Sequence, residues 1–411
     1  MNIGWIDFSK EERDKALDLL RLFQETGAVD ELGIGIARDA FADRFFPGTS
    51  TLMTRAKYFV VVPYIIQEKL EEGARTSQTV RETLNLINDE ERRFAERMLK
   101  KHSGDKNAGI IGSTALGLRR WVKRSPSELY WNGIRTLGIH GNRGMSLSQF
   151  ISAGLEYFRS RAKSLGTIGR GESEEGDDVD AGRMTGFKPM DINGIYRRGW
   201  MKDADISLTR AEAVFLCDKI RSNISGSVFA TALENRVDML KYGGDFIAFA
   251  EGIMPDVNAD TRRLLELACY FSRIVYAARV RYNMMIQGDR SDVALQCWDE
   301  FLEEGVPAVS RMNEVICALE QQGVSLNYNG TKHFLLSLAE SFHSSDWIKM
   351  DFLVKQREIA IKGKERAKLL HCEKYSAENW IGGGYLEYRL SDVARIVADI
   401  IEGLEGGDVQ S

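Results

Sequence analysis

Proline is scarce in this chain, and its scarcity constrains the fold more than any other feature of the sequence. The 411 residues contain 6 prolines, about 1.5% where roughly 5% is usual. Because proline interrupts helices, a chain with so few of them can form long helical stretches. Leu, Ala, Met, Glu and Arg, which all favour helices, are plentiful. We therefore predict a mainly α fold, within the broader α+β class.

Start and stop signals place helices along most of the chain. Ser9-Lys-Glu-Glu12 and Thr209-Arg-Ala-Glu212 have the spacing of capping boxes, and Pro47-Gly48 stops a short helix predicted over residues 36–45. A first helix over 10–25 and this second one, joined by glycine-rich turns, resemble a helix-turn-helix or winged-helix-like module. Further helices are expected over 51–66, 77–101, 113–123, from 125 onward, and over 146–165, 232–240, 261–287, 291–304, 308–322 and 391–404, the later ones as a C-terminal helical bundle.

Charge is distributed unevenly along the chain. Residues 1–170 hold 27 Lys and Arg against 21 Asp and Glu, whereas residues 171–411 hold 28 against 39. Between the two parts, the glycine-rich stretch 166–190 carries a run of acids that is typical of a loop or linker. We expect a basic nucleic-acid-binding and catalytic domain over 1–165, an acidic loop over 166–190, and a helical domain over 191–411.

The basic charge is densest over residues 109–170, which contain 10 Lys and Arg but only two acids. Interleaved aromatic residues make this segment typical of a nucleic-acid surface. The alternative is a solvated helix face whose charges pair with the acidic C-terminal half. We favour polyanion binding, because so dense an excess of one sign would otherwise repel itself. The candidate phosphate contacts are Arg119, Arg120, Lys123, Arg124 and, further upstream, Arg55.

Several classes of protein are disfavoured by the sequence. The longest apolar runs, such as Tyr58 to Ile66, are far shorter than the roughly 20 residues of a membrane-spanning helix, and the first residues are charged where a signal peptide is apolar. We expect a cytoplasmic protein without a membrane partner. The five cysteines lie at least 20 positions apart, and the five histidines show no zinc or HExxH spacing. We expect neither a metal nor another cofactor.

Glycine-rich motifs for phosphate binding are weak. Gly33-x-Gly35 lacks both a preceding strand and a third glycine, so we discard dinucleotide binding. Gly382-Gly383-Gly384, between Trp380 and Tyr385, fits either a phosphate cradle or a tight turn, and the turn is favoured. The stretch 349–368, with seven bases against three acids, gives the acidic half one positive face. No Walker lysine, kinase loop or G-x-S-x-G motif is present in the sequence.

Several N-terminal motifs resemble a bacterial family of unknown function. They are Gly4-Trp-Ile-Asp-Phe-Ser9, Asp30-Glu-Leu-Gly-Ile-Gly35, Phe46-Pro-Gly-Thr-Ser-Thr-Leu52, and Pro126-Ser127 with Tyr130-Trp-Asn-Gly133. The resemblance is dense over residues 1–140 and thin beyond Pro189. It implies a place beside helicases and phospholipase-D-like nucleases in anti-phage loci.

The same region is also similar to an anti-phage DNA glycosylase that removes modified cytosine from viral DNA. Residues 52–58 are loosely similar to winged-helix alkylpurine glycosylases, which place a Gln-x-Gln or Gln-x-Asp pair upstream. Those positions fall near Phe46 and Gly48 here, so that catalytic pair cannot be carried over.

The leading hypothesis is a monofunctional DNA glycosylase of anti-phage defence, which flips a modified base out of phage DNA and excises it. A carboxylate would stabilise the positive charge that develops on the sugar. The candidate catalytic acids are Asp7, Asp43 and Asp39. The candidate base contacts are Trp5, Tyr58, Tyr130 and Trp131, which would stack, and Asn132, which would read the base edge.

Two alternatives remain. The first is a non-catalytic DNA-binding or adaptor subunit, which loads a helicase or nuclease partner and uses its acidic C-terminal half as the docking surface. The second is a toxin that acts on RNA or nucleotide pools. For Asp7, a cap or salt bridge ahead of the first helix is the favoured single role.

Overall fold

A computed structural model describes residues 30–105, 107–142, 144–168, 187–288, 292–303, 305, 309–327, 330–375 and 380–406. Within these residues the chain is mainly helical, as predicted. The described residues contain no β-strand, and their only β-type pairing is an isolated antiparallel bridge between His140 and Met190. The helix predicted over 10–25 lies outside the described residues.

The described chain divides into two compact units. The first comprises residues 30–38 and 270–386, and the second comprises 39–269 and 387–406. The boundaries fall inside two helices, α2 (Gly35–Phe45) and α11 (Ala259–Gln287). These limits differ from the domain limits that charge and composition indicate, because residues on both sides of 166–190 contribute to the second unit.

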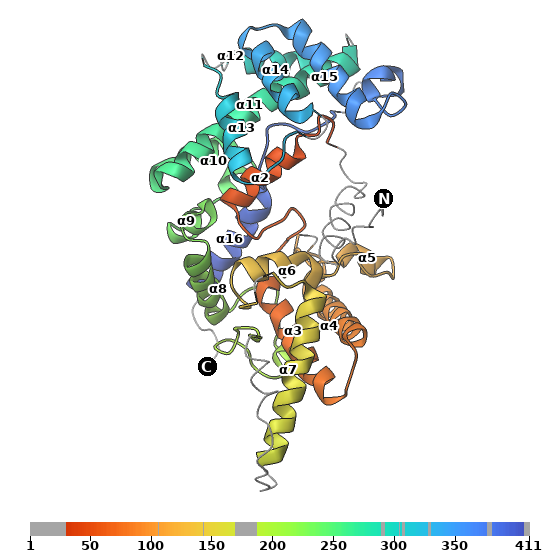
Figure 1. Cartoon of the computed structure of the whole chain (residues 1–411), viewed down its shortest axis with the longest axis vertical. Helices are drawn as coiled ribbons and strands as arrows, with labels where there is room; N and C mark the ends of the chain where they lie inside the picture. Colours follow the sequence, from red (N-terminus) through yellow and green to blue (C-terminus); the bar gives the residue numbers. More distant parts are fainter. Residues whose placement is uncertain are drawn as a thin grey trace, which may run out of the picture. The chain divides into compact units, whose positions relative to one another are not determined.

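The core of the second unit is built around α3 (Tyr58–Arg75), which packs against α4 (Val80–Lys101), α6 (Pro126–Thr136) and α7 (Leu147–Ile168) (Figure 1). Every residue from Tyr58 to Ile66 is buried. A helix that is apolar on all sides is stable only where neighbours surround it. The longest apolar run of the sequence is therefore a core helix.

Capping boxes define where several helices of this unit begin. Ser125 accepts a hydrogen bond from the Glu128 amide ahead of α6, and Thr209 accepts one from Glu212 ahead of α8 (Arg210–Asn223). In each box the glutamate accepts in return from the cap amide, so that two amides at the helix start are satisfied. The Thr209 box is the one that the sequence predicts.

The C-terminal helix α16 (Leu390–Glu405) completes the second unit by packing against α8 and α9 (Val228–Glu234). It is strongly amphipathic, and its buried face includes Val393, Ile396, Val397 and Ile400. Apolar residues at this spacing form a single stripe that requires a partner surface. The short helix α10 (Phe246–Ile253) also belongs to this unit.

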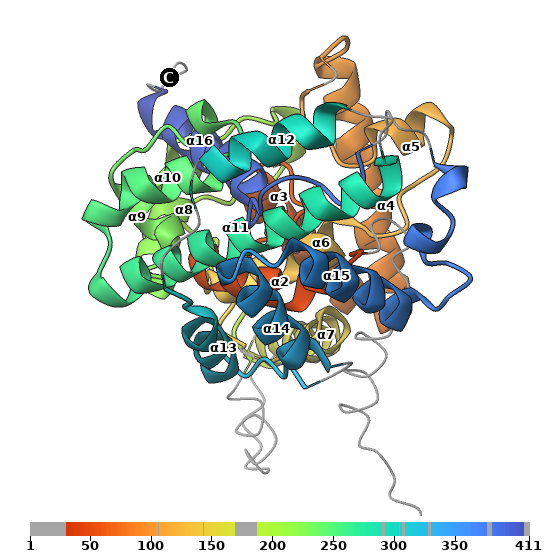
Figure 2. The same ribbon diagram turned by 90° about the horizontal axis from the view of Figure 1, so that it is seen from above.

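The first unit contains the later part of α11 with α12 (Asp292–Glu303), α13 (Met312–Gln321), α14 (Thr331–His343) and α15 (Trp347–Lys362). Figure 2 shows α14 beside α15, and the two helices pack directly. Trp298, Phe301, Phe342 and Trp347 form an aromatic cluster that joins α12, α14 and α15. Large rings at such positions supply much of a small unit's buried apolar area.

Some helices differ in extent from the prediction. α3 begins at Tyr58, because residues 49–57 form turns in place of the first helical turns. The helix expected over 113–123 is the short α5 (Ser113–Gly117), which ends where Arg119 adopts a left-handed backbone with φ 56°. Among the helices that the structure describes, none combines the length and apolarity of a membrane span.

Candidate functional site

A short loop between α5 and α6 carries the densest exposed positive charge of the predicted basic segment. This cationic loop, residues 118–124, presents Arg119, Arg120, Lys123 and Arg124 to solvent. The Trp121 indole donates a hydrogen bond to the Asn88 side chain on α4, which anchors the loop to that helix. The residues from Ser113 to Ser127 include no acid. The loop therefore offers clustered, exposed positive charge, as phosphate binding requires.

Two predicted catalytic acids, Asp39 and Asp43, lie one turn apart on α2 and share a cation. Arg389 donates to Asp43 at 2.5 Å and to the Thr49 carbonyl at 2.9 Å, and its guanidinium lies 3.9 Å from Asp39. The side chains of Asp39 and Asp43 are 42% and 64% exposed, whereas that of Arg389 is 11% exposed. Arg389 therefore fixes two accessible carboxylates next to each other.

The backbone that positions Arg389 is unusual. Tyr388 and Arg389 both have positive φ, 48° and 67°, although neither is glycine, and each such residue costs on the order of 1 kcal/mol. Asp392 follows in the first turn of α16, where burial raises its pKa to about 6, with a further contribution from the charge of Glu387. The cluster thus combines exposed carboxylates, a guanidinium and an acid that titrates near neutrality.

The predicted base-stacking residues Tyr58, Tyr130 and Trp131 lie inside the protein. The Tyr130 hydroxyl donates to the Arg55 carbonyl at 2.9 Å and accepts from the Thr54 amide at 2.9 Å, and the Tyr58 hydroxyl accepts from the Ile111 amide. Trp131 stacks on the buried His140. In this conformation, protein atoms cover the ring faces on which a flipped base would stack.

Arg55, predicted to contact phosphates, is a buried structural residue. Its Nε lies 3.0 Å and 2.8 Å from the two carboxylate oxygens of Asp399, and its Nη1 donates to the Ala108 carbonyl. The Arg55 side chain is 5% exposed, too little to reach a phosphate at the surface. The sequence alone predicts that Arg55 contacts DNA, because its acidic partner, Asp399, lies 344 residues further along the chain and gives no local signal of the pairing.

The remaining predicted site residues have less defined surroundings. Asn132 is exposed, and its side chain accepts a hydrogen bond from Arg135. Trp5 and Asp7 lie outside the described residues. No group of three or more His, Cys, Asp or Glu suited to a metal ion occurs within the described part of the chain.

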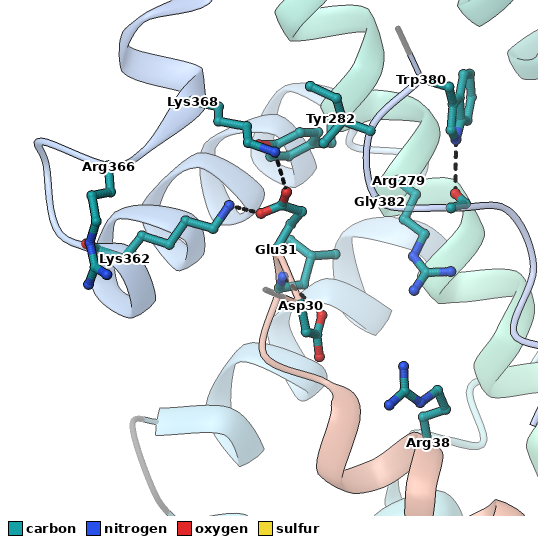
Figure 3. Close-up of a pocket in the computed structure, with 13 residues that line it drawn as sticks. Asp30, Glu31, Arg38, Arg279, Tyr282, Lys362, Arg366, Lys368, Trp380 and Gly382 are labelled. Atoms are coloured by element: carbon teal, nitrogen blue, oxygen red, sulfur yellow. Dashed lines mark hydrogen bonds and ion pairs between the residues drawn. The ribbon is translucent and has the colours of Figure 1, made fainter. Parts of the chain in front are cut away.

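Sequence reasoning missed a pocket of about 750 Å³ in the first unit (Figure 3). Its wall combines the start of α2, one face of α11, the end of α15 and the segment 380–383. The residues that line it are Asp30, Glu31, Leu32, Arg38, Arg279, Tyr282, Lys362, Arg366, Lys368, Trp380, Ile381, Gly382 and Gly383.

Hydrogen bonds to one buried acid hold one wall of the pocket in place. Glu358 accepts from the Tyr282 hydroxyl at 2.7 Å, from Lys362 Nζ at 3.0 Å and from the Lys368 amide at 3.0 Å. Glu31 forms ion pairs with Lys362 and with Lys368. These side chains are therefore preorganised, because each is tied to another group of the wall.

Two further sides of the pocket are formed by arginines and a glycine turn. Figure 3 shows the guanidinium groups of Arg38 and Arg279 pointing toward the same space. Arg279 also donates to the Gly384 carbonyl, and the Trp380 indole donates to the Gly383 carbonyl at 2.9 Å. Gly382 and Gly383 have φ 89° and 76°, which residues with side chains rarely adopt.

The sequence contains signals for this pocket, but they lie in segments that are far apart along the chain. The basic stretch 349–368 and the glycine turn 382–384 each contribute to its lining. Gly33-x-Gly35, discarded as a dinucleotide motif, lies at its edge, where Asp30 accepts from the Leu32 and Gly35 amides ahead of α2. Only the tertiary fold brings the three segments together.

The fold and these sites define a mainly helical protein with an exposed cationic loop and a separate cationic pocket. Residues 1–167 match the sequence profile of a family of unknown function, DUF6361. That match covers the predicted basic domain and stops short of α8 to α16. No curated protein and no solved structure matches the chain.

Proposed function

We propose that this protein binds DNA, with the cationic loop as its phosphate contact. The observation that carries the proposal is the exposure of four cations within six residues, with no acid between Ser113 and Ser127. Such a cluster gains free energy when phosphates displace its counterions. In this proposal residues 1–165 supply a helix-turn-helix or winged-helix-like binding module, 166–190 a linker, and 191–411 a helical bundle for a partner.

Reversing both arginine charges in Arg119→Glu/Arg120→Glu should weaken binding to a DNA duplex by about tenfold or more at 0.1 M salt. The slope of log affinity against log salt should also decrease by about 2, because two fewer counterions are released. Fluorescence anisotropy over a salt series measures both quantities. Arg197→Glu/Arg198→Glu is the matched control, an adjacent exposed pair outside the loop. Equal losses of DNA affinity in the two variants would show that the cationic loop is not the phosphate contact.

We further propose that the bound DNA is phage DNA and that the protein excises a modified base from it. In base excision, water adds to the anomeric carbon of the sugar as the base departs, and a carboxylate stabilises the cationic transition state. Asp43 and Asp39 support this chemistry because both are accessible and Arg389 holds them side by side.

Excision is tested by incubating the protein with base-modified phage DNA and then cleaving abasic sites with alkali. We expect cleavage with the wild type, a loss of at least about a hundredfold with Asp43→Asn, and a smaller loss with Asp39→Asn. Asp203→Asn, on a similarly exposed acid, is the control. Because Asp7 lies outside the described residues, Asp7→Asn is assayed in parallel.

A non-catalytic adaptor for a helicase or nuclease is the second candidate function. One observation favours it: Tyr58, Tyr130 and Trp131, the rings predicted to receive a flipped base, are buried. Tight binding of modified DNA that leaves every base intact, in wild type and Asp43→Asn alike, would support the adaptor and exclude excision.

A further inference from the structure

The pocket of the first unit has an excess of positive charge. Five of its lining residues are cations, namely Arg38, Arg279, Lys362, Arg366 and Lys368, and two are acids. When the buried Glu358 behind the wall is also counted, cations still exceed acids by two. A concave surface with this excess concentrates anions, because its low-dielectric walls focus the field into the cavity.

The acids of the pocket are committed to structural contacts. Asp30 caps the start of α2 through the Leu32 and Gly35 amides, and Glu31 is paired with Lys362 and Lys368. Arg38 and Arg279 face the cavity from the opposite side (Figure 3). Arginine matches the geometry of phosphate oxygens, so these two guanidinium groups are suited to contact the phosphate of a ligand in the cavity.

The pocket also has an apolar, planar component. Trp380 and Ile381 line it, and the Trp380 indole is held by its hydrogen bond to the Gly383 carbonyl. A ring next to clustered cations recognises a ligand that is both planar and anionic, because bases stack on aromatic side chains while phosphates bind the cations. The volume of about 750 Å³ lies within the range of ordinary small-molecule sites.

We propose that this pocket binds a nucleoside phosphate, with the phosphate against Arg38 and Arg279 and the base against Trp380. The binding group is either a free nucleotide or the terminal nucleotide of a strand, which share this chemistry. The proposal goes beyond DNA binding by the cationic loop. It depends on different residues in a different unit, so either proposal can fail alone.

Isothermal titration calorimetry of the full chain tests the site with ATP, AMP, adenosine, tripolyphosphate and a 5′-phosphorylated tetrathymidylate. We expect ATP to bind at least tenfold more tightly than adenosine and than tripolyphosphate, because only the nucleotide engages both the cations and the ring. Binding of the tetranucleotide only when it is phosphorylated assigns the site to strand ends, and failure of the tetranucleotide assigns it to free nucleotides. No binding of any phosphate-bearing probe at millimolar concentration overturns the proposal.

Variants locate the binding within the pocket. Arg38→Gln should weaken ATP binding by about tenfold, whereas Arg44→Gln, on the same helix but outside the pocket lining, should not change it. Trp380→Leu should weaken ATP binding by a similar factor, and Trp380→Phe, which keeps a ring but loses the indole hydrogen bond, should restore most of it. Thermal melts confirm that each variant is folded. Equal effects of Arg38→Gln and Arg44→Gln, or equal affinities of Trp380→Leu and wild type, overturn the assignment.

Discussion

Replacing Asp399 by Ala is expected to lower the free energy of unfolding by about 3 to 5 kcal/mol. The carboxylate of Asp399 accepts hydrogen bonds from Arg55 Nε and from the Ala56 amide at 2.9 Å, and it is 1% exposed. Its removal leaves the Arg55 guanidinium buried without its counterion, which costs far more than the pair contributes when intact. Urea denaturation followed by circular dichroism measures the change.

Two further variants separate the charge effect from packing. Glu402→Ala, an exposed position on the same helix, should change stability by less than about 0.5 kcal/mol. The double variant Arg55→Met/Asp399→Leu should recover much of the loss, because neither charge then remains buried. A single Asp399→Ala variant as stable as the wild type would contradict this account. Weaker DNA binding by a fully folded Arg55→Met protein would instead show that Arg55 contributes to DNA binding.

Stability should fall as the pH rises from about 4.5 to about 8 because of a single buried glutamate, Glu91 on α4. Burial raises the pKa of Glu91 from 4.5 to about 8, against hydrogen bonds from Ser127 that lower it, and the charge of Glu128 adds to the increase. In this interval the native state binds the proton while the unfolded chain has released it, so that increasing pH favours unfolding. The slope is up to about 1.4 kcal/mol per pH unit.

The variant Glu91→Gln isolates this effect. It should be as stable as the wild type near pH 4.5 and more stable by several kcal/mol at pH 8, because the amide never ionises. The Ser127 amide, which donates to Glu91 at 2.6 Å, can donate equally to the glutamine oxygen. Glu96→Gln, at an exposed position of the same helix, is the control. Parallel stability curves for the wild type and Glu91→Gln between pH 5 and pH 8 would rule out the raised pKa.

Helices were the part of the fold that could be predicted from the sequence, since the signals that define them are local. The low proline content agrees with the mainly helical fold of the described residues. The Thr209 capping box lies at the start of α8, and the periodic apolar residues of 391–404 lie in α16. The limits of the compact units could not be predicted, because they depend on packing between distant segments. Charge and composition change near residue 166, but the contacts that form a core give no such local signal in the sequence.

The candidate site residues could also be predicted only in part, because their spacing is local in the sequence whereas their burial and their partners depend on distant segments. The exposure of Arg119 and Arg120 agrees with the sequence-based expectation of a cationic surface, and the i, i+4 spacing of Asp39 and Asp43 places both on one helix face. Sequence alone could not show that Tyr130 is buried, because a ring inside a core and a ring on a binding surface follow the same local pattern. Nor could it show that Arg389 is the partner of both acids.

The pairing of Arg55 with Asp399 has a consequence for how the chain is made. The ribosome releases Arg55 long before Asp399, which follows 344 residues later, so the second unit cannot close until α16 has been synthesised. The whole of 270–386 is synthesised in the meantime and can fold first. A nascent or truncated chain that ends before α16 would therefore keep the Arg55 guanidinium without its counterion and would expose the apolar surface that α16 covers, which is the kind of surface that chaperones bind.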